Sequence, residues 1–127
     1  RIIFAERLKK REVHLARYKI SDLGLDTFNY NGHTTTSDAL WTGLPVLTKS
    51  GESFASRVAA SILNSLDLND LITTSEKEYE EKALYLAKNR DEILRFKRQL
   101  KTINEVNFSK SEDYTKEIEK LYMKIIK

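Results

Sequence analysis

The stretch LDTFNYNGHTTTSDALWTGLPVLT, residues 25–48, decides the fold of this chain. Its two ends, 25–27 and 46–48, are short segments that look like buried strands, and the residues between them predict a tight turn and then a helix over about residues 35–42. Gly43 ends that helix, because glycine favours the position just after a helix C-terminus. Strand, helix and strand in this order predict a parallel sheet with crossover helices.

The turn before this helix has the composition of a phosphate-binding site. Gly32 lets the backbone approach a ligand closely. The hydroxyl and N–H groups of Thr34, Thr35 and Thr36 stand at the helix start, where the helix dipole favours an anion. Thr34 and Thr35 are also ordinary N-cap residues, and His33 either contacts a diphosphate or caps a neighbouring carbonyl. In an open α/β sheet, ligands bind at this end of the strands.

Two other groups have both a structural and a functional interpretation. Asp38 lies three residues after Thr35, which is the spacing of a carboxylate capping box, while a carboxylate in a nucleotide site also suits ribose hydroxyls. His14 and Arg17 share one face of a helix expected over residues 12–19, and spacing alone favours a solvated charged face there.

The remaining pattern divides the chain into a Rossmann-like core, residues 1–74, and a helical C-terminal extension of the same domain, residues 75–127. The expected strands of the core cover residues 1–4, 25–27, 46–48 and 71–73, and a helix capped by Ser53 is expected over 54–66. The extension begins with a capping box, Ser75-Glu-Lys-Glu78, and its apolar stripes predict three helices, the second after Asp91 and the third after Ser111.

Composition narrows the class of protein. With 127 residues, 40% of them hydrophobic, the chain can bury one core but not two. No apolar run reaches the ~18 residues of a membrane span, and the absence of cysteine excludes disulfides and fits the cytoplasm, where we expect the protein. The first 20 residues hold seven Lys and Arg against two Glu but only two aromatic residues, so nucleic acid is not an expected partner.

Four blocks of the sequence resemble the C-terminal catalytic lobe of the O-linked N-acetylglucosamine transferases and their SPINDLY-like relatives. In chain order, these blocks are Gly24–Thr27, Asn31–Thr35, Asp38–Pro45 and Gly51–Ser61. The resemblance starts at Arg1, is strong to about Leu63 and continues loosely through Tyr122. It implies the glycosyltransferase B fold, in which two Rossmann-like lobes face a cleft and the C-terminal lobe holds the nucleotide. The other lobe is then expected outside this chain.

The resemblance also implies roles for individual residues. The residues that match the diphosphate-binding positions of relatives are His33, Thr34 and Thr35, and the ribose-binding position matches Asp38. The positions around the uridine match Arg11, His14 and Arg17. Relatives carry Lys where this chain has Arg11, and the preceding loop is one residue longer here, so Lys10 is the alternative cation.

The function implied is that of an inverting transferase, which moves N-acetylglucosamine from UDP-N-acetylglucosamine to Ser or Thr hydroxyls of a protein, with no cofactor and no metal. The protein acceptor would bind through the other lobe, and this chain alone is expected to be inactive. Two alternatives remain open from the residues. One is a transferase for another sugar or a non-protein acceptor, and the other is a non-catalytic Rossmann-like module that binds a phosphorylated ligand.

Overall fold

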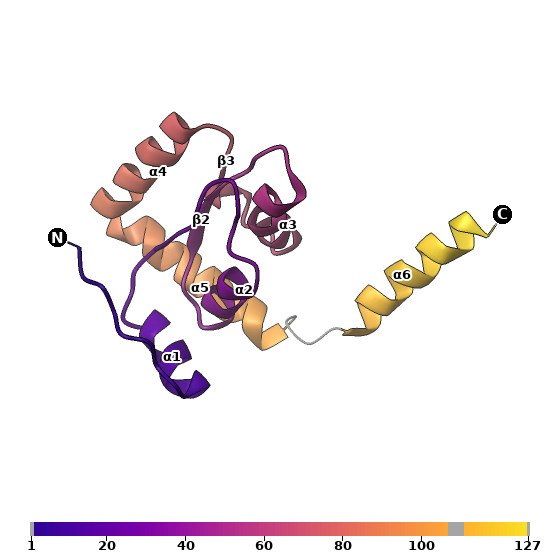
Figure 1. Ribbon diagram of the computed structural model, residues 1–127, viewed down its shortest axis with the longest axis horizontal. Helices are drawn as coiled ribbons and strands as arrows, with labels where there is room; N and C mark the ends of the chain where they lie inside the picture. The colour runs from indigo at the N-terminus through magenta and orange to yellow at the C-terminus, as the bar shows by residue number, and fades with distance from the viewer. Residues whose placement is uncertain (1, 107–110, 127) are drawn as a thin grey trace.

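The fold is built on a three-stranded parallel sheet, seen in a computed structural model that describes residues 2–106 and 111–126. The strands are, in order across the sheet, β1 (Gly24–Leu25), β2 (Val46–Lys49) and β3 (Ile72–Thr73). The helices that connect them are α2 (Thr34–Trp41) and α3 (Val58–Ser65), so each crossover contains a helix (Figure 1). The predicted parallel sheet with crossover helices is confirmed.

The core joins the sheet region to the helices that follow it. After β3 come α4 (Glu76–Lys88), α5 (Arg90–Val106) and α6 (Ser111–Ile125), as the apolar stripes predict. The core cluster takes fully buried side chains from both parts of the chain, among them Leu40, Leu63, Leu86, Phe96 and Leu100. The Asn104 amide of α5 also donates to the carbonyl oxygens of Leu40 and Trp41, at 3.1 and 2.9 Å. The end of α2 is therefore held by α5.

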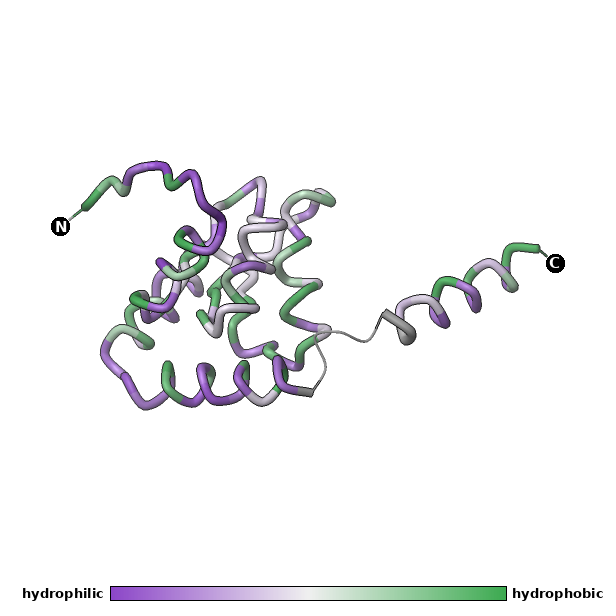
Figure 2. Tube along the Cα trace, turned by 90° about the horizontal axis from the view of Figure 1, so that it is seen from below, coloured by the Kyte–Doolittle hydropathy of each residue, from purple (hydrophilic) through white to green (hydrophobic). Residues whose placement is uncertain are grey.

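The last helix, α6, stands apart from the rest of the described chain in both views (Figures 1 and 2). Green and purple segments alternate along it in Figure 2, as expected for an amphipathic helix. Leu121 and Ile125 are 52% and 76% exposed on this helix. No helix of the described part is long and apolar enough to cross a membrane.

Two local predictions are wrong. Residues 2–4, expected as part of a strand, form no secondary structure, and Ile2 and Phe4 are 85% and 93% exposed. The run has β-forming residues, but a strand also needs a neighbour, and none of the described strands pairs with this segment. Arg1, the first residue of that prediction, lies outside the described residues.

The helix expected over residues 54–66 is divided in two. Ser53 caps a short 3₁₀ helix, η1 (Phe54–Ser56), through a reciprocal pair of hydrogen bonds with Ser56, and α3 begins only at Val58. The N–H of Gly51 donates to the Ser56 carbonyl at 2.8 Å, which holds this turn in place. The cap at Ser53 is confirmed, and a second 3₁₀ turn, η2 (Asn69–Leu71), leads into β3.

Candidate nucleotide-binding site

Asp26, directly after β1, is the residue that fixes the predicted phosphate turn. Its Oδ1 accepts hydrogen bonds from the backbone N–H groups of Thr27, at 2.9 Å, and Gly32, at 2.7 Å. Its Oδ2 accepts from the Thr48 hydroxyl on β2, at 2.6 Å. One carboxylate thus ties together the end of β1, the end of the turn and the neighbouring strand. Asp26 was not among the predicted site residues, although an Asp between a strand and a glycine turn favours turn formation.

The rest of the turn is closed by its own polar groups. The Asn31 side chain donates to the Thr27 carbonyl at 3.0 Å, and its backbone N–H donates to the Ala55 carbonyl at 2.9 Å. The Thr27 hydroxyl donates to the Tyr30 carbonyl at 2.6 Å. Asn29 has φ of +66°, a conformation that Asn tolerates better than most residues. These bonds leave the turn little freedom to change shape.

The helix α2 begins at Thr34, one residue earlier than expected, and its N-cap residue is His33. Among the described residues, no side chain caps this helix, so the N-cap interpretation of Thr34 and Thr35 and the capping box from Thr35 to Asp38 are wrong. Within residues 2–106 and 111–126, the backbone N–H groups of residues 34–36 make no hydrogen bond. Free N–H groups at a helix start, together with the helix dipole, form an anion site.

The His33 ring lies between two aromatic side chains beside this helix start. It stacks on Tyr30, with centroids 4.9 Å apart and planes at 14°, and meets the Phe54 ring edge-on at 6.2 Å. Its Nε2 is buried and has no hydrogen-bond partner in the described part of the chain. The structure therefore offers no support for a carbonyl-capping role of this histidine. A buried nitrogen without a partner is available to a ligand.

Asp38, on the first turns of α2, meets the neighbouring helix α1 (Arg11–Tyr18). The Nη2 of Arg11 lies 3.4 Å from Asp38 Oδ1, with the Arg11 side chain 76% exposed and that of Asp38 19% exposed. The structure thus brings together the residue predicted for the ribose and one of those predicted for the uridine. No contact of Lys10, the alternative cation, with Asp38 is found in the described chain.

The other two residues of α1 have partners near their own helix. His14 Nε2 lies 3.4 Å from the Tyr18 hydroxyl, and Arg17 donates to the Glu6 carbonyl at 2.6 Å. Burial, and secondarily the charge of Asp38, raises the pKa of Tyr18. His14 and Arg17 are therefore close along one helix, but their contacts do not reach the α2 start in this structure.

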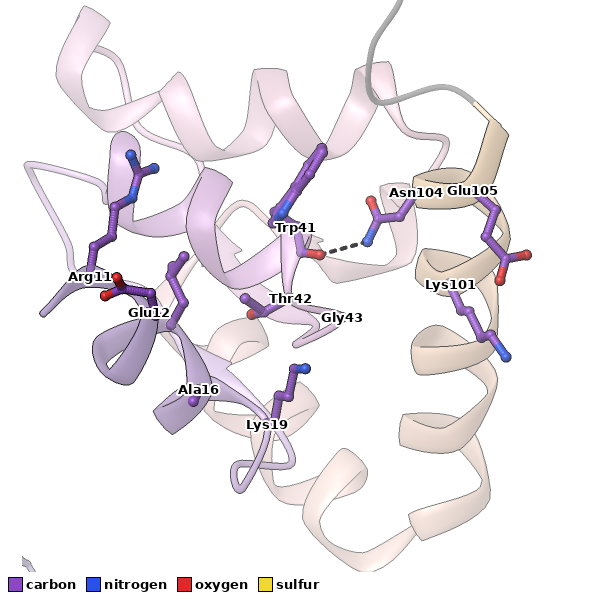
Figure 3. Close-up of a pocket in the computed structure, with 11 residues that line it drawn as sticks. Arg11, Glu12, Ala16, Lys19, Trp41, Thr42, Gly43, Lys101, Asn104 and Glu105 are labelled. Atoms are coloured by element: carbon purple, nitrogen blue, oxygen red, sulfur yellow. Dashed lines mark hydrogen bonds between the residues drawn. The ribbon is translucent and has the colours of Figure 1, made fainter.

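Three hollows adjoin these residues. One of about 270 Å³ lies between β1 and the start of α2 and is lined in part by Asp26, Gly32 and Thr35. One of about 280 Å³ is lined by Arg11, Leu15, Ser37, Asp38 and Trp41. A larger one, of about 850 Å³, lies between α1, the end of α2 and α5 (Figure 3).

The large hollow is not where most of the predicted site residues meet. Of those residues, Arg11 alone lines it, whereas both Arg11 and Asp38 line the hollow of about 280 Å³. Lys101 and Glu105 of α5, labelled in Figure 3, lie far along the chain from the turn. The hollow of about 280 Å³ therefore joins a residue predicted for the uridine to the residue predicted for the ribose.

The turn, the start of α2 and the carboxylate one turn later lie beside a Rossmann-like parallel sheet with crossover helices. The chain belongs to glycosyl transferase family 41, whose model matches residues 1–118. The predicted family and fold class are confirmed.

Relatives of this family are similar over most of the chain. This chain is 42% identical over 93 residues to a UDP-N-acetylglucosamine–peptide N-acetylglucosaminyltransferase of Caenorhabditis elegans. The match covers 73% of this chain and 8% of that protein. It is 41% identical over 101 residues to the probable enzyme of this kind named SEC in Arabidopsis thaliana, covering 79% and 10%. With the tomato protein SPINDLY it is 32% identical over 110 residues, covering 86% and 12%.

A solved structure agrees with this assignment. The mutant K341M of the Thermobaculum terrenum O-GlcNAc transferase superposes with a TM-score of 0.83 at 34% identity, over 89% of this chain and 22% of that one. The chain thus spans about a tenth of the length of the curated relatives it matches.

Proposed function

We propose that this chain forms the nucleotide-sugar-binding part of an inverting glycosyltransferase that moves N-acetylglucosamine from UDP-N-acetylglucosamine to Ser or Thr hydroxyls of proteins. The names of the relatives support the donor and the acceptor. The observation that carries the proposal is the helix start, where the N–H groups of residues 34–36 and the Nε2 of His33 have no partner in the described part of the chain.

The UDP diphosphate would lie against the start of α2. There the N–H groups and hydroxyls of Thr34 and Thr35 and the ring nitrogen of His33 donate to its oxygens. The ribose hydroxyls would donate to the Asp38 carboxylate, and the uracil would lie toward α1, near Arg11, His14 and Arg17. Asp38 suits hydroxyls rather than phosphate, because a carboxylate repels an anion but accepts from a neutral hydroxyl.

Transfer requires the UDP leaving group to accept negative charge as the bond to the sugar breaks. Donors that are already in place stabilise that charge without further rearrangement, and this is their largest contribution to the rate. The turn meets this condition, since Asp26 and Asn31 hold it by hydrogen bonds that need no ligand. N–H groups and cations then suffice for the leaving group, and the proposal includes no metal. The protein acceptor would bind through the other lobe.

Titration of UDP into isotope-labelled protein tests the nucleotide assignment. We expect the amide signals of residues 32–38 and of His14 to move, with weak affinity because one wall of the cleft is absent. Inorganic pyrophosphate should move the first region and uridine the second. Saturating UDP that moves neither region, while another phosphate compound does, would show the nucleotide assignment to be wrong.

A transfer assay tests the rest of the proposal. The chain alone should give no transfer from UDP-N-acetylglucosamine to a Ser-containing peptide, since the acceptor would bind the other lobe. The full-length protein should give transfer, and its activity with UDP-N-acetylglucosamine should exceed that with other sugar nucleotides. Activity only with a different sugar nucleotide would correct the donor while leaving the nucleotide site intact.

A further inference from the structure

We infer that Asp26 is a positioning residue for the diphosphate. It binds no ligand, but through the Gly32 N–H it sets where the free donors of α2 begin. The inference rests on the proposed function, because it concerns the same site. It names a residue that neither the sequence pattern nor the family resemblance assigned.

Asp26 connects several segments of the chain that lie around the turn. Asp26 Oδ1 holds Gly32, the residue immediately before His33, and Oδ2 holds Thr48 on β2. From the other side, the Tyr79 hydroxyl of α4 donates to the Asp26 carbonyl at 3.0 Å. Asp26 is therefore held between β2 and α4. Through its bond to the Gly32 N–H, it fixes the position of the residue just before the start of α2.

The bond to Gly32 also decides which donors remain for the ligand. Gly32 N–H would otherwise be one more free donor beside the helix start, and it is already used. The free donors then start inside the first turn of α2, where they point along the helix axis and add to its dipole. Without this bond, the turn would have to be ordered by the ligand, at a cost to affinity.

The charge of Asp26 is a disadvantage at this place, because a carboxylate near a diphosphate repels it. Its three hydrogen bonds to the protein direct its lone pairs to donors of the turn and the sheet. What the turn needs is thus the acceptor oxygen and not the charge. Asp26→Asn can keep an oxygen facing the Thr27 and Gly32 N–H groups while its amide nitrogen donates to the Thr48 oxygen.

Three variants have different expected results. Asp26→Ala removes the acceptor, and its affinity for UDP and for pyrophosphate should fall about tenfold, which is the loss expected for one well-placed hydrogen bond. Its affinity for uridine, which contacts α1, should stay unchanged. Asp26→Asn should bind UDP at least as tightly as the wild type. Thr48→Val removes one of the bonds that fix Asp26 and leaves its bonds to the Thr27 and Gly32 N–H groups, so it should lower the melting temperature and weaken UDP binding much less than Asp26→Ala does.

Each affinity is measured by titration followed by amide signals, at a temperature where thermal melts show every variant folded. Equal affinity of Asp26→Ala and wild type for UDP would overturn the inference, and so would a loss in Asp26→Asn as large as in Asp26→Ala. If Asp26→Ala does not fold, Asp26→Asn and Thr48→Val test the inference. A tenfold loss of UDP affinity in Thr48→Val would then overturn it. Failure of the wild type to bind UDP would instead contradict the proposed function.

Discussion

The phosphate turn and the helix α1, which we propose as the two halves of one nucleotide site, are built in opposite ways. The turn, residues 26–33, is held by hydrogen bonds from β2, from the loop before α3 and from α4. The helix α1 (Arg11–Tyr18) has no buried residue, and its polar side chains bond to its own turns, to residue 6 or to Asp38. The proposed diphosphate end of the site is thus preorganised within this chain, whereas the proposed nucleoside end is attached less firmly, mainly where Tyr18 packs against the core.

The difference follows from the size of each element. A helix of eight residues is not stable alone and depends on packing for its position. The helix α2 has the same length, but Ala39 and Leu40 are buried in the core beside α5. We therefore expect substitutions around the turn to change stability and diphosphate binding, and substitutions on α1 to change mainly nucleoside binding.

The largest difference should appear between Leu40 and Leu15. Leu40 of α2 is fully buried, and Leu40→Ala should lower the free energy of unfolding by about 2–5 kcal/mol, the range for such cavities. Leu15 of α1 is only partly buried, so Leu15→Ala should cost about 1 kcal/mol. Urea unfolding measures both. Equal losses in the free energy of unfolding would mean that α1 is as firmly packed as α2, which contradicts the difference proposed between the two helices.

Among substitutions that change ligand binding but not stability, Asp38→Asn should have the largest effect on UDP affinity. If the carboxylate accepts from the ribose hydroxyls, the variant should bind UDP about 1.5–3 kcal/mol less tightly and bind pyrophosphate as before. Its stability should change little, because Arg11, the partner of Asp38 in this pair, is largely exposed to solvent. The matched control is Asp22→Asn, which removes an exposed carboxylate paired with Lys97 and should leave UDP binding intact. Equal UDP affinity of Asp38→Asn and wild type would leave Asp38 without a ligand role.

Gly32 gives the sharpest test of how tightly the turn is packed. A Cβ at this position would lie 2.7 Å from the Thr36 Oγ1 and 3.4 Å from the Asp26 Oδ1. Because Thr36 is buried, Gly32→Ala should cost about 1–3 kcal/mol of stability and weaken pyrophosphate binding. The control is Gly43→Ala. Gly43 has φ of +87° with no atom within 4 Å of an added Cβ, so stability should fall by about 1 kcal/mol without loss of anion affinity.

The sequence predicted those features that depend on local spacing. The position of α2, which Gly43 limits, is predicted to within one residue at each end, and the parallel sheet, which follows from the alternation of strands and helices, is confirmed. The capping of α4 by Ser75 is also confirmed, but the Glu78 carboxylate accepts from the N–H and hydroxyl of Thr74, at 2.8 Å each. These hydrogen bonds lower the pKa of Glu78.

Features that depend on contacts between distant segments were not predictable. That Asp26 meets both Gly32 and Thr48 becomes visible only when the turn is folded against β2. A run of three threonines suggested an N-cap, yet His33 takes that position and no side chain caps the helix. The roles of the site residues, and the boundary at residues 74 and 75, stay predictions, and the core shared by α2 and α5 shows how closely the two parts are connected.

Tyr79 tests the support that α4 gives to the turn. Burial, and then the charge of Asp26, raises the pKa of Tyr79 from 10.0 to about 12. A raised pKa means that the fold favours the protonated phenol, so this contribution to stability is complete below pH 10 and is lost as the pH rises toward 12.

Tyr79→Phe removes the hydrogen bond to the Asp26 carbonyl and should cost about 0.5–1.5 kcal/mol at neutral pH. The difference between the variant and the wild type should shrink between pH 10 and 12, measured by urea unfolding at each pH. Tyr85→Phe, a substitution of a half-exposed tyrosine on the same helix, is the control. No loss of stability in Tyr79→Phe at neutral pH would show that the Tyr79 hydroxyl does not support the turn, and a loss that stays constant to pH 12 would show that its pKa is not raised.

The smallest effect on UDP binding is expected at Arg11, because its side chain is the most exposed part of the proposed nucleoside site. Its guanidinium is mostly exposed and lies 3.4 Å from Asp38, so Arg11→Ala should weaken UDP binding by at most about 1 kcal/mol. The loss should shrink as salt is added, because an exposed charge is screened. Arg11→Lys keeps the charge and should bind almost as well as the wild type. If Arg11→Ala changes nothing at low salt while Lys10→Ala weakens binding, Lys10 is the nucleoside cation, and the extra loop residue has shifted the role by one position.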